Sequence, residues 1–132
     1  MERYVLDTSA VIKYLDETFP DKALLFLDQV LDEESNISFI TQIELLVWSP
    51  PNPDDLNIYQ TFVDNSNVIH VNEDIIEHCI TIRKTTKIKV PDALIAASAI
   101  VFDLTLVSDN DQDFNKVLEM DIDLKYLNPK KL

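Results

Sequence analysis

Residues 90–102, VPDALIAASAIVF, decide how this chain folds. From Ala93 onward Ser98 is the only polar residue of the stretch, so the sequence predicts a helix that is buried on most sides. Pro91 suits the first position of that helix, and Asp92 then lies in its first turn, where the helix dipole favours an anion. Asp92 is therefore either a simple complement to the dipole or a carboxylate held rigidly at the floor of a cleft.

Strand-like and helix-like stretches alternate along the rest of the chain. This alternation predicts an α/β fold, a single domain over residues 1–132 whose parallel sheet is covered by helices on both faces. The predicted strands are residues 3–7, 37–40, 68–71, 104–107 and 122–126. A first helix follows residue 7 at once, with Thr8 or Ser9 as its N-cap. Further helices are predicted at about residues 21–34, 41–48, 54–64, after a cap at Asn72, and at 111–118.

The chain is strongly acidic, with 24 acidic and 11 basic residues and a formal net charge of −13. Such a surface does not attract nucleic acid by its average charge, because phosphate affinity comes mainly from lysine and arginine. Nucleic acid is then a substrate only if a local basic patch and bound cations outweigh the average. The densest basic segment comprises Arg83, Lys84, Lys87 and Lys89 and runs straight towards Asp92. It is either such a patch or simply a solvated face of the protein.

Several classes of protein are excluded by composition. Glycine is absent, which rules out the P-loop and the glycine-rich dinucleotide fingerprint. The single cysteine, Cys79, excludes an internal disulfide and suits a reducing compartment. No apolar run reaches the roughly 18 residues of a membrane span, and the first residues lack a signal-peptide pattern. We therefore expect a cytoplasmic protein without a membrane partner.

Three of the predicted strands run directly into stretches that contain polar and acidic residues: Asp7, then Thr41 to Glu44, then the run from Ser108 to Asp113. Because ligands bind at the carboxyl ends of strands in open α/β sheets, we expect these residues to meet Asp92 at one edge. Clustered carboxylates repel one another unless a cation neutralises them, and oxygen ligands favour a hard cation, Mg²⁺ or Mn²⁺. The sequence therefore predicts a divalent-metal site.

Each acid also has a structural explanation. Asp7 can accept hydrogen bonds from the next helix, and Thr41-x-x-Glu44 matches a capping box in which Glu44 bonds back to the helix start. Asp109, Asp111 and Asp113 resemble the start of an EF-hand loop. However, Phe114 stands where that loop needs glycine and Met120 where it needs glutamate, so calcium binding of that type is excluded. The remaining metal-binding residue types, His70, His78 and Cys79, lack a partner motif and are interpreted as structural.

Four stretches in this order and spacing resemble the PIN domain, specifically the VapC-type ribonuclease toxins of prokaryotic toxin–antitoxin pairs. They are residues 4–12 (YVLDTSAVI), 41–45 (TQIEL), 91–97 (PDALIAA) and 106–114 (LVSDNDQDF), and the resemblance covers nearly the whole chain. It implies a three-layer α/β/α fold around a central, mostly parallel sheet of four to five strands. It also implies a Mg²⁺- or Mn²⁺-dependent endoribonuclease.

The resemblance assigns roles to individual residues. Asp7 and Asp92 would be the principal metal ligands, Glu44 would bind a second metal ion or orient the water, and Ser9 would form a hydrogen bond within the site. The last family motif departs from its usual form, because Ser108 replaces threonine and the usual metal-side position holds Asn110. Its flanking aspartates, Asp109 and Asp113, are both candidates for the fourth acid, and Asp109 is favoured.

The resemblance further implies partners: an RNA substrate, a second copy of the chain in a homodimer, and a cognate antitoxin whose C-terminal segment masks the cleft. The basic segment from Arg83 to Lys89 is then the candidate contact with the RNA backbone. Two rival hypotheses remain. The domain is a catalytically weak module that docks a basic partner segment, or, more distantly, a haloacid-dehalogenase-like phosphatase that uses Asp7. That family, however, has aspartate or sometimes threonine where Ser9 stands, and usually a nearby glycine.

Overall fold

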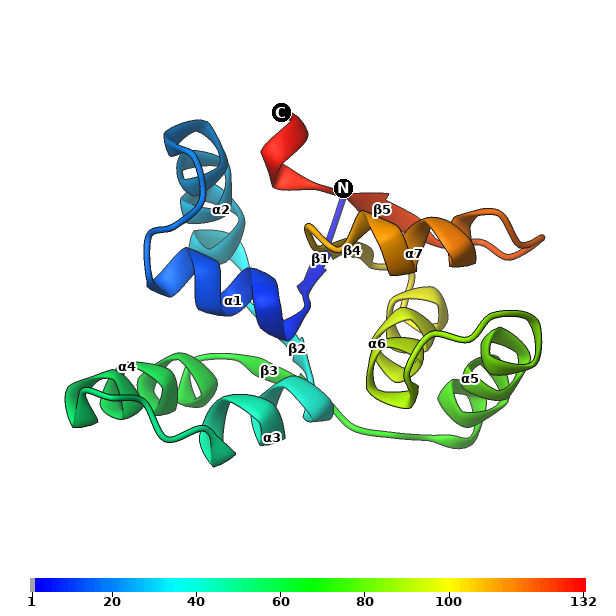
Figure 1. Cartoon of the computed structure of the whole chain (residues 1–132), viewed down its shortest axis with the longest axis horizontal. Coiled ribbons are helices and arrows are strands. Elements are labelled where there is room, and N and C mark those ends of the chain that lie inside the picture. Colours follow the sequence, from blue (N-terminus) through cyan, green and yellow to red (C-terminus); the bar gives the residue numbers. More distant parts are fainter. Residues whose placement is uncertain (1) are drawn as a thin grey trace.

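The structure is a computed structural model and describes residues 2–132. It is one five-stranded sheet with helices on both faces (Figure 1). All strand pairs are parallel, and the strand order is β3-β2-β1-β4-β5. In chain order the elements are β1 (Tyr4–Leu6), α1 (Thr8–Leu15), α2 (Asp21–Glu33), β2 (Asn36–Ser38), α3 (Phe39–Val47), α4 (Pro53–Asp64), β3 (Asn67–Ile69), α5 (Glu73–Thr85), α6 (Val90–Val101), β4 (Thr105–Val107), α7 (Asp111–Leu118), β5 (Lys125–Leu127) and the 3₁₀ turn η1 (Pro129–Lys131).

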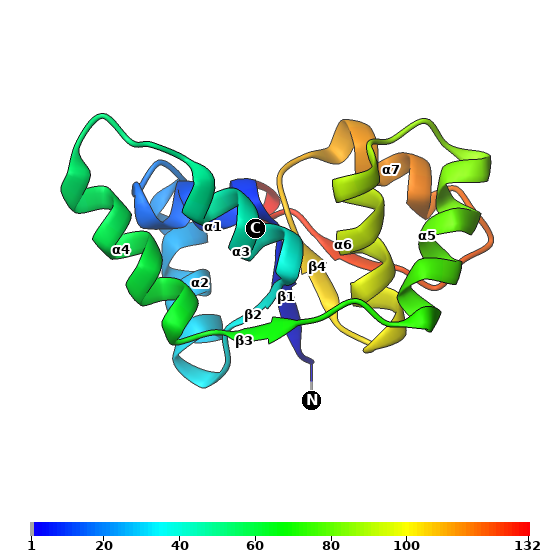
Figure 2. The ribbon, with the colours of Figure 1, turned by 90° about the horizontal axis from the view of Figure 1, so that it is seen from below.

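The sheet divides the core into two layers because neighbouring strand residues point to opposite faces. Val5 belongs to a buried cluster with residues of α5, α6 and α7, whereas Leu6 belongs to a cluster with residues of α1 to α4. Figure 2 shows the two groups of helices on opposite sides of the strands. The three-layer α/β/α architecture expected from the sequence is confirmed.

The helix at residues 90–102 is buried as its composition predicts. Of the twelve residues of α6, six are buried, including the polar Ser98, whose hydroxyl donates to the Leu94 carbonyl at 2.9 Å. Lys89 is the N-cap, so Pro91 occupies the second helical position where the sequence suggested the first. No helix within residues 2–132 combines the length and apolarity needed to cross a membrane.

Several element starts differ from expectation, and the largest shift is in the last strand, which begins at Lys125 and not at residue 122. Two helix starts differ as well. Asp7 itself caps α1, and its Oδ1 accepts the Ala10 amide at 2.8 Å, so the expected caps Thr8 and Ser9 lie inside the helix. β2 ends two residues earlier than expected, and Ser38 caps α3. Both shifts have the same cause. Asp7 and Ser38 stand where a strand ends, and because their side chains can cap a helix, the helix begins directly after them.

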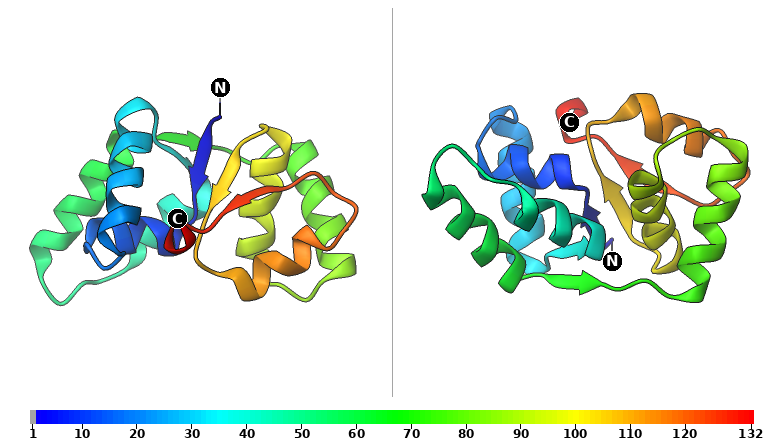
Figure 3. Two further views of the ribbon diagram at one scale, coloured as in Figure 1. Left: turned by 90° about the horizontal axis from the view of Figure 1, so that it is seen from above. Right: turned by 60° about the horizontal axis from the view of Figure 1, so that its bottom comes forward.

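Parallel pairing brings the carboxyl ends of the strands to one edge. Leu6 of β1 pairs with both Ile37 of β2 and Val107 of β4, so the residues that follow these strands are neighbours. After β5 the chain turns into η1 at the same edge. Figure 3 shows this turn between the α1–α2 side of the molecule and the start of α7.

Candidate active site

A cavity of about 640 Å³ lies at the carboxyl edge of the sheet. It collects residues from the starts of α1, α6 and α7, from the middle of α3 and from η1. It brings together five of the residues that the sequence singled out, the acids Asp7, Glu44, Asp92 and Asp109 with Ser9, and its lining is completed by Thr8, Ile12, Lys13, Ile95, Asn110 and Lys130.

Asp7 is the most deeply placed of the acids, with only 4% of its surface exposed. Burial raises the pKa of its carboxyl group to about 7, and the negative charges of Asp109 and Asp92 act in the same direction. Hydrogen bonds from the Ser108 side chain and the Ala10 amide oppose that rise. A carboxylate in this position is costly to ionise, so Asp7 takes up a proton or a cation readily.

Asp92 projects from the first turn of α6, half-buried. Its pKa is raised, first by burial and then by the charges of Asp113 and Glu44, while Lys89 lowers it. Burial and neighbouring acids therefore disfavour the negative charge of both Asp7 and Asp92.

Glu44 lies in the middle of α3, so the capping box expected between Thr41 and Glu44 is wrong. Instead, the hydroxyl of Thr8 donates to Glu44 Oε1 at 2.6 Å and lies 3.1 Å from the Thr41 hydroxyl. This contact joins α3 to the start of α1, directly beside Asp7. Glu44 therefore does not cap α3, and its carboxylate lines the cavity.

Asp109 is held by two lysines that the sequence analysis did not single out. Lys13 and Lys130 both contact its Oδ2, the latter at 2.9 Å, and Ser9 donates to Oδ1 at 3.1 Å. Burial alone would raise the pKa of Asp109, but the hydrogen bonds and charges of these partners lower that pKa to about 2. One local signal was available: Ser9 and Lys13 are four residues apart and share a face of α1.

The other acids of the last motif lie around the start of α7. Asn110 caps this helix, lines the cavity and donates from its amide to Asp113 Oδ2 at 3.0 Å. Asp111 is bonded by residues of the C-terminal segment: Tyr126 donates to it at 2.7 Å, and Lys131 forms an ion pair at 2.6 Å. Asp111 is therefore explained by local structure, whereas the choice between Asp109 and Asp113 as fourth acid stays a prediction.

The basic segment lies at the end of α5 and in the loop before α6. Arg83 donates to the Ile88 carbonyl at 2.8 Å, which fixes that loop, and Lys84, Lys87 and Lys89 are exposed. The cations that line the cavity come instead from α1 and η1. Contact of this segment with RNA stays a prediction.

The remaining residues of the sequence analysis lie elsewhere. Cys79 is buried in the core against α6, as expected. His70 is exposed and His78 is half-buried, and the His78 ring bonds the Asp74 carbonyl of its own helix at 2.8 Å.

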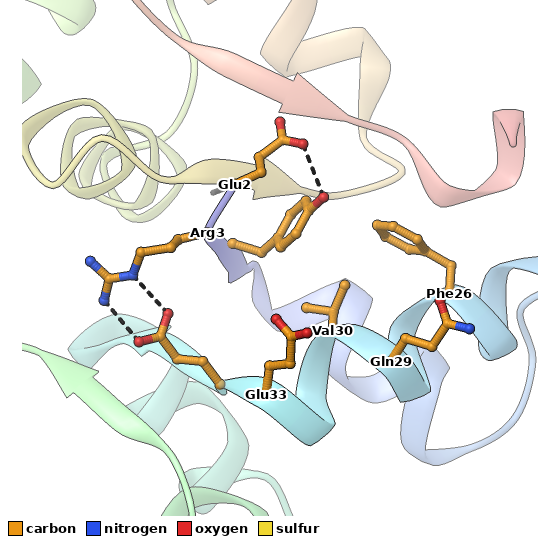
Figure 4. Close-up of a pocket in the computed structure, with 8 residues that line it drawn as sticks. Glu2, Arg3, Phe26, Gln29, Val30 and Glu33 are labelled. Atoms are coloured by element: carbon orange, nitrogen blue, oxygen red, sulfur yellow. Dashed lines mark hydrogen bonds and ion pairs between the residues drawn. The ribbon is translucent and has the colours of Figure 1, made fainter.

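A second cavity, of about 450 Å³, lies beside the other end of β1 (Figure 4). Several of its polar groups bond one another: Arg3 donates to both oxygens of Glu34, at 2.9 and 2.8 Å, and Tyr4 donates to Glu2 at 3.1 Å. The first of these contacts ties the residue before β1 to the residue after α2. The acids that the sequence predicts to act together line the cavity at the carboxyl edge instead.

Whether the carboxyl-edge cavity suits a divalent cation depends on its donors. Across residues 2–132, no three side chains of histidine, cysteine, aspartate or glutamate are grouped closely enough to hold a metal ion. Mg²⁺, however, is usually held by one or two carboxylates and keeps several waters. Asp7 and Asp92 provide that oxygen-only donor set, and the charge of each is poorly compensated by the protein. The residues present therefore fit a hard cation bound through these two carboxylates.

Comparison with known proteins identifies the family to which the chain belongs. No curated protein sequence matches the chain. Among solved structures, a chain of VapBC-1 from nontypeable Haemophilus influenzae is similar, with 24% identity, coverage of 96% of this chain and 97% of that chain, and a TM-score of 0.76. A chain of DNA-bound VapBC from Salmonella typhimurium has 20% identity, coverage of 98% and 99%, and a TM-score of 0.77. A chain of FitAcB from Neisseria gonorrhoeae has 22% identity, coverage of 98% of this chain and 99% of that chain, and a TM-score of 0.72.

These similarities establish a shared fold over almost the whole length of the chains. The sequence itself carries the family assignment, since the model of the PIN domain matches residues 4–119 and includes all four stretches that were singled out. The chain belongs to the PIN domain family.

Proposed function

We propose that this protein is a metal-dependent endoribonuclease that hydrolyses phosphodiester bonds of RNA. The observation that carries the proposal is the pair Asp7 and Asp92, two carboxylates of raised pKa that line one open cavity at the carboxyl edge of the sheet. Membership of the PIN family supports it, and so does the fit of this pair to Mg²⁺ or Mn²⁺.

In this proposal Asp7 and Asp92 hold the cation, which when bound supplies positive charge to the phosphate and activates water for attack. Glu44, fixed by the hydroxyl of Thr8, orients the attacking water or holds a second ion. Ser9 keeps Asp109 in place through its hydrogen bond. None of these roles needs a nucleophilic side chain, which agrees with a cavity lined by carboxylates and without histidine or cysteine.

We further propose that the protein is the toxin of a type II toxin–antitoxin pair. Support comes from its structural neighbours, which include a toxin–antitoxin complex from Klebsiella pneumoniae at 24% identity and a TM-score of 0.72. A net charge of −13 favours an antitoxin with a basic segment, because complementary fields speed association. The proposal includes a homodimer and a cytoplasmic location.

Cleavage of RNA by the purified protein tests the proposal. We expect single-stranded or structured RNA to be cut with Mg²⁺ or Mn²⁺ and to survive when a chelator is added. Asp7→Asn and Asp92→Asn should each lower the rate about 100-fold or more, since removal of groups that merely support a metal ligand already costs 10- to 100-fold. Asp103→Asn is the matched control, because Asp103 pairs with Lys125 at 2.7 Å before β4, away from the cavity. Cleavage that survives both cavity substitutions would reject the assignment.

A catalytically weak module that docks a basic partner segment is the second candidate. It is favoured by the lack of a three-ligand metal group within residues 2–132 and by the engagement of Asp109 with lysines. In that case metal titration gives no signal and RNA stays intact, while a lysine-rich peptide binds wild type more tightly than Asp92→Asn. Turnover of a small phosphomonoester would instead support the phosphatase alternative, which family membership does not favour.

A further inference from the structure

Lys13 and Lys130 form a compact cationic group inside a cavity that is otherwise acidic. Both ammonium groups contact the same oxygen, Oδ2 of Asp109, whose side chain is only 6% exposed. The side chains of Lys13 and Lys130 stay 38% and 47% exposed, and both residues line the same cavity as Asp7, Glu44 and Asp92. One carboxylate is thus matched by two cations, and the group carries a net charge of +1.

A single lysine would have been enough to neutralise Asp109. Each ammonium group has three N–H donors, and its contact with Oδ2 uses one of them. The lysines also come from elements far apart in the chain, α1 and η1, so the fold brings two cations to one buried carboxylate. The excess charge and the remaining donors suit an anion that enters the cavity from solvent.

We propose that Lys13 and Lys130, fixed by Asp109, form a binding subsite for a backbone phosphate of the RNA, a proposal that rests on the proposed function and deepens it. Flexible lysine side chains lose conformational entropy when they grip a ligand. Asp109 reduces that loss because it holds both ammonium groups before the substrate arrives. It is a positioning residue here, where the sequence suggested a metal ligand.

Binding of RNA without metal separates this subsite from catalysis. A labelled single-stranded RNA is titrated with protein in excess chelator at several NaCl concentrations, and affinity is followed by fluorescence anisotropy. Lys13→Met and Lys130→Met keep the apolar stem of lysine and remove its charge. Lys131→Met is the matched control, because Lys131 lies in the same turn and pairs with Asp111, outside the cavity lining. Thermal unfolding shows whether each variant is folded.

We expect each cavity variant to bind RNA about tenfold more weakly, as for the loss of one charged hydrogen bond. The slope of log affinity against log salt should fall by about 0.7 for each lysine removed, the change expected for one phosphate contact on a single strand. Lys131→Met should bind as wild type does, although its net charge changes equally. An unchanged affinity and salt slope in the double variant Lys13→Met/Lys130→Met would overturn the subsite.

Activity assays distinguish the failure of this subsite from the failure of the proposed function. If the lysines control RNA binding while no cleavage occurs with Mg²⁺ or Mn²⁺, the nuclease proposal fails and the subsite stands. If the double variant cleaves RNA with the kcat/KM of wild type, the subsite fails and the nuclease stands. A rise in activity on Lys130→Met would also overturn the subsite, because it would identify Lys130 as a plug of the cavity.

Asp109→Asn tests the positioning role directly. We expect weaker RNA binding with the metal concentration for half-maximal activity unchanged, since Asp109 acts through the lysines. An increased metal requirement with unaltered RNA affinity would return Asp109 to the metal ligands and overturn the proposal.

Discussion

Asp7 and Asp109 line the same cavity, yet their carboxyl groups have pKa values of about 7 and about 2. Both are buried, and burial alone raises both values. The difference comes from their partners, because Asp109 has two lysines and Asp7 has only neutral hydrogen-bond donors beside further acids. Two chemically identical side chains are thereby separated into an anchored anion and a site for a proton or cation.

The first prediction at this scale concerns the stability of the metal-free protein. Between its ordinary pKa of 3.8 and about 7, folded Asp7 binds a proton that the unfolded chain has released, so the free energy of unfolding falls as the pH rises through this window. Asp7→Asn removes the penalty and still caps α1. It should stabilise the metal-free protein by up to about 4 kcal/mol at about pH 8 and by little at about pH 4.

Urea unfolding of wild type and Asp7→Asn in chelator, at the two pH values, measures this difference in the free energy of unfolding. Asp109 contributes stability that is present above 3.8 and lost as the pH falls towards 2, and both proteins share it, so it cancels in the comparison. An equal effect of Asp7→Asn at both pH values would show that Asp7 is not protonated in this range.

Among the elements, α1 and α6 end in the same way although the chain has no glycine. After α1 the amides of Glu17 and Thr18 bond the carbonyls of Tyr14 and Lys13, at 3.1 and 2.9 Å, which is the Schellman pattern. Glu17 takes the left-handed conformation with φ of 57°, where glycine is usual. Asp103 does the same after α6, with φ of 55°. Each turn redirects the chain after a helix that carries site residues, at a conformational cost.

The prediction at the scale of elements follows from that cost. Glu17→Gly relieves the left-handed strain and should raise the free energy of unfolding by about 0.5–1 kcal/mol. Asp16→Gly is the matched control, because Asp16 has φ of −82° and should lose stability from the same replacement. Thermal and urea unfolding of both variants give the measurement. A gain for Asp16→Gly equal to that for Glu17→Gly would contradict the strain argument.

On the scale of the whole molecule, a net charge of −13 gives the folded chain a self-repulsion that salt screens. We therefore expect added Mg²⁺ to stabilise the protein in two ways: by general screening and by the proposed binding at Asp7 and Asp92. The second contribution follows the ratio of free ion to Kd and reaches about 2.7 kcal/mol at one hundred times Kd.

Melting temperatures at matched ionic strength separate the two contributions. We expect NaCl to raise Tm modestly, and MgCl₂ or MnCl₂ to raise it further in wild type. Asp92→Asn should keep the effect of NaCl and lose the additional effect of the divalent ions. Equal shifts with NaCl and with the divalent salts in wild type would mean that the cavity binds no specific cation.

The sequence by itself determined the layered α/β architecture, the buried helix α6 and the position of acids after strands. These follow from local patterns, such as the apolar run of α6, the Asn72 cap of α5 and the bounds of α7, which match the prediction at both ends. Parallel pairing then requires the residues after β1, β2 and β4 to meet. The gathering of Asp7, Glu44 and Asp92 around one cavity was therefore within reach of sequence reasoning.

Only the tertiary structure decided which of these residues are free to act. Thr41 and Glu44 have the spacing of a capping box, but Ser38 starts the helix, and Glu44 bonds Thr8 across the cavity wall. The sequence makes Asp109 a candidate metal ligand, and only the fold shows that Lys13, 96 residues away, and Lys130 contact its carboxylate. Pairings of this kind depend on strand order and on where the C-terminal turn lies, and no local pattern encodes the long-range contacts that set a carboxylate's charge.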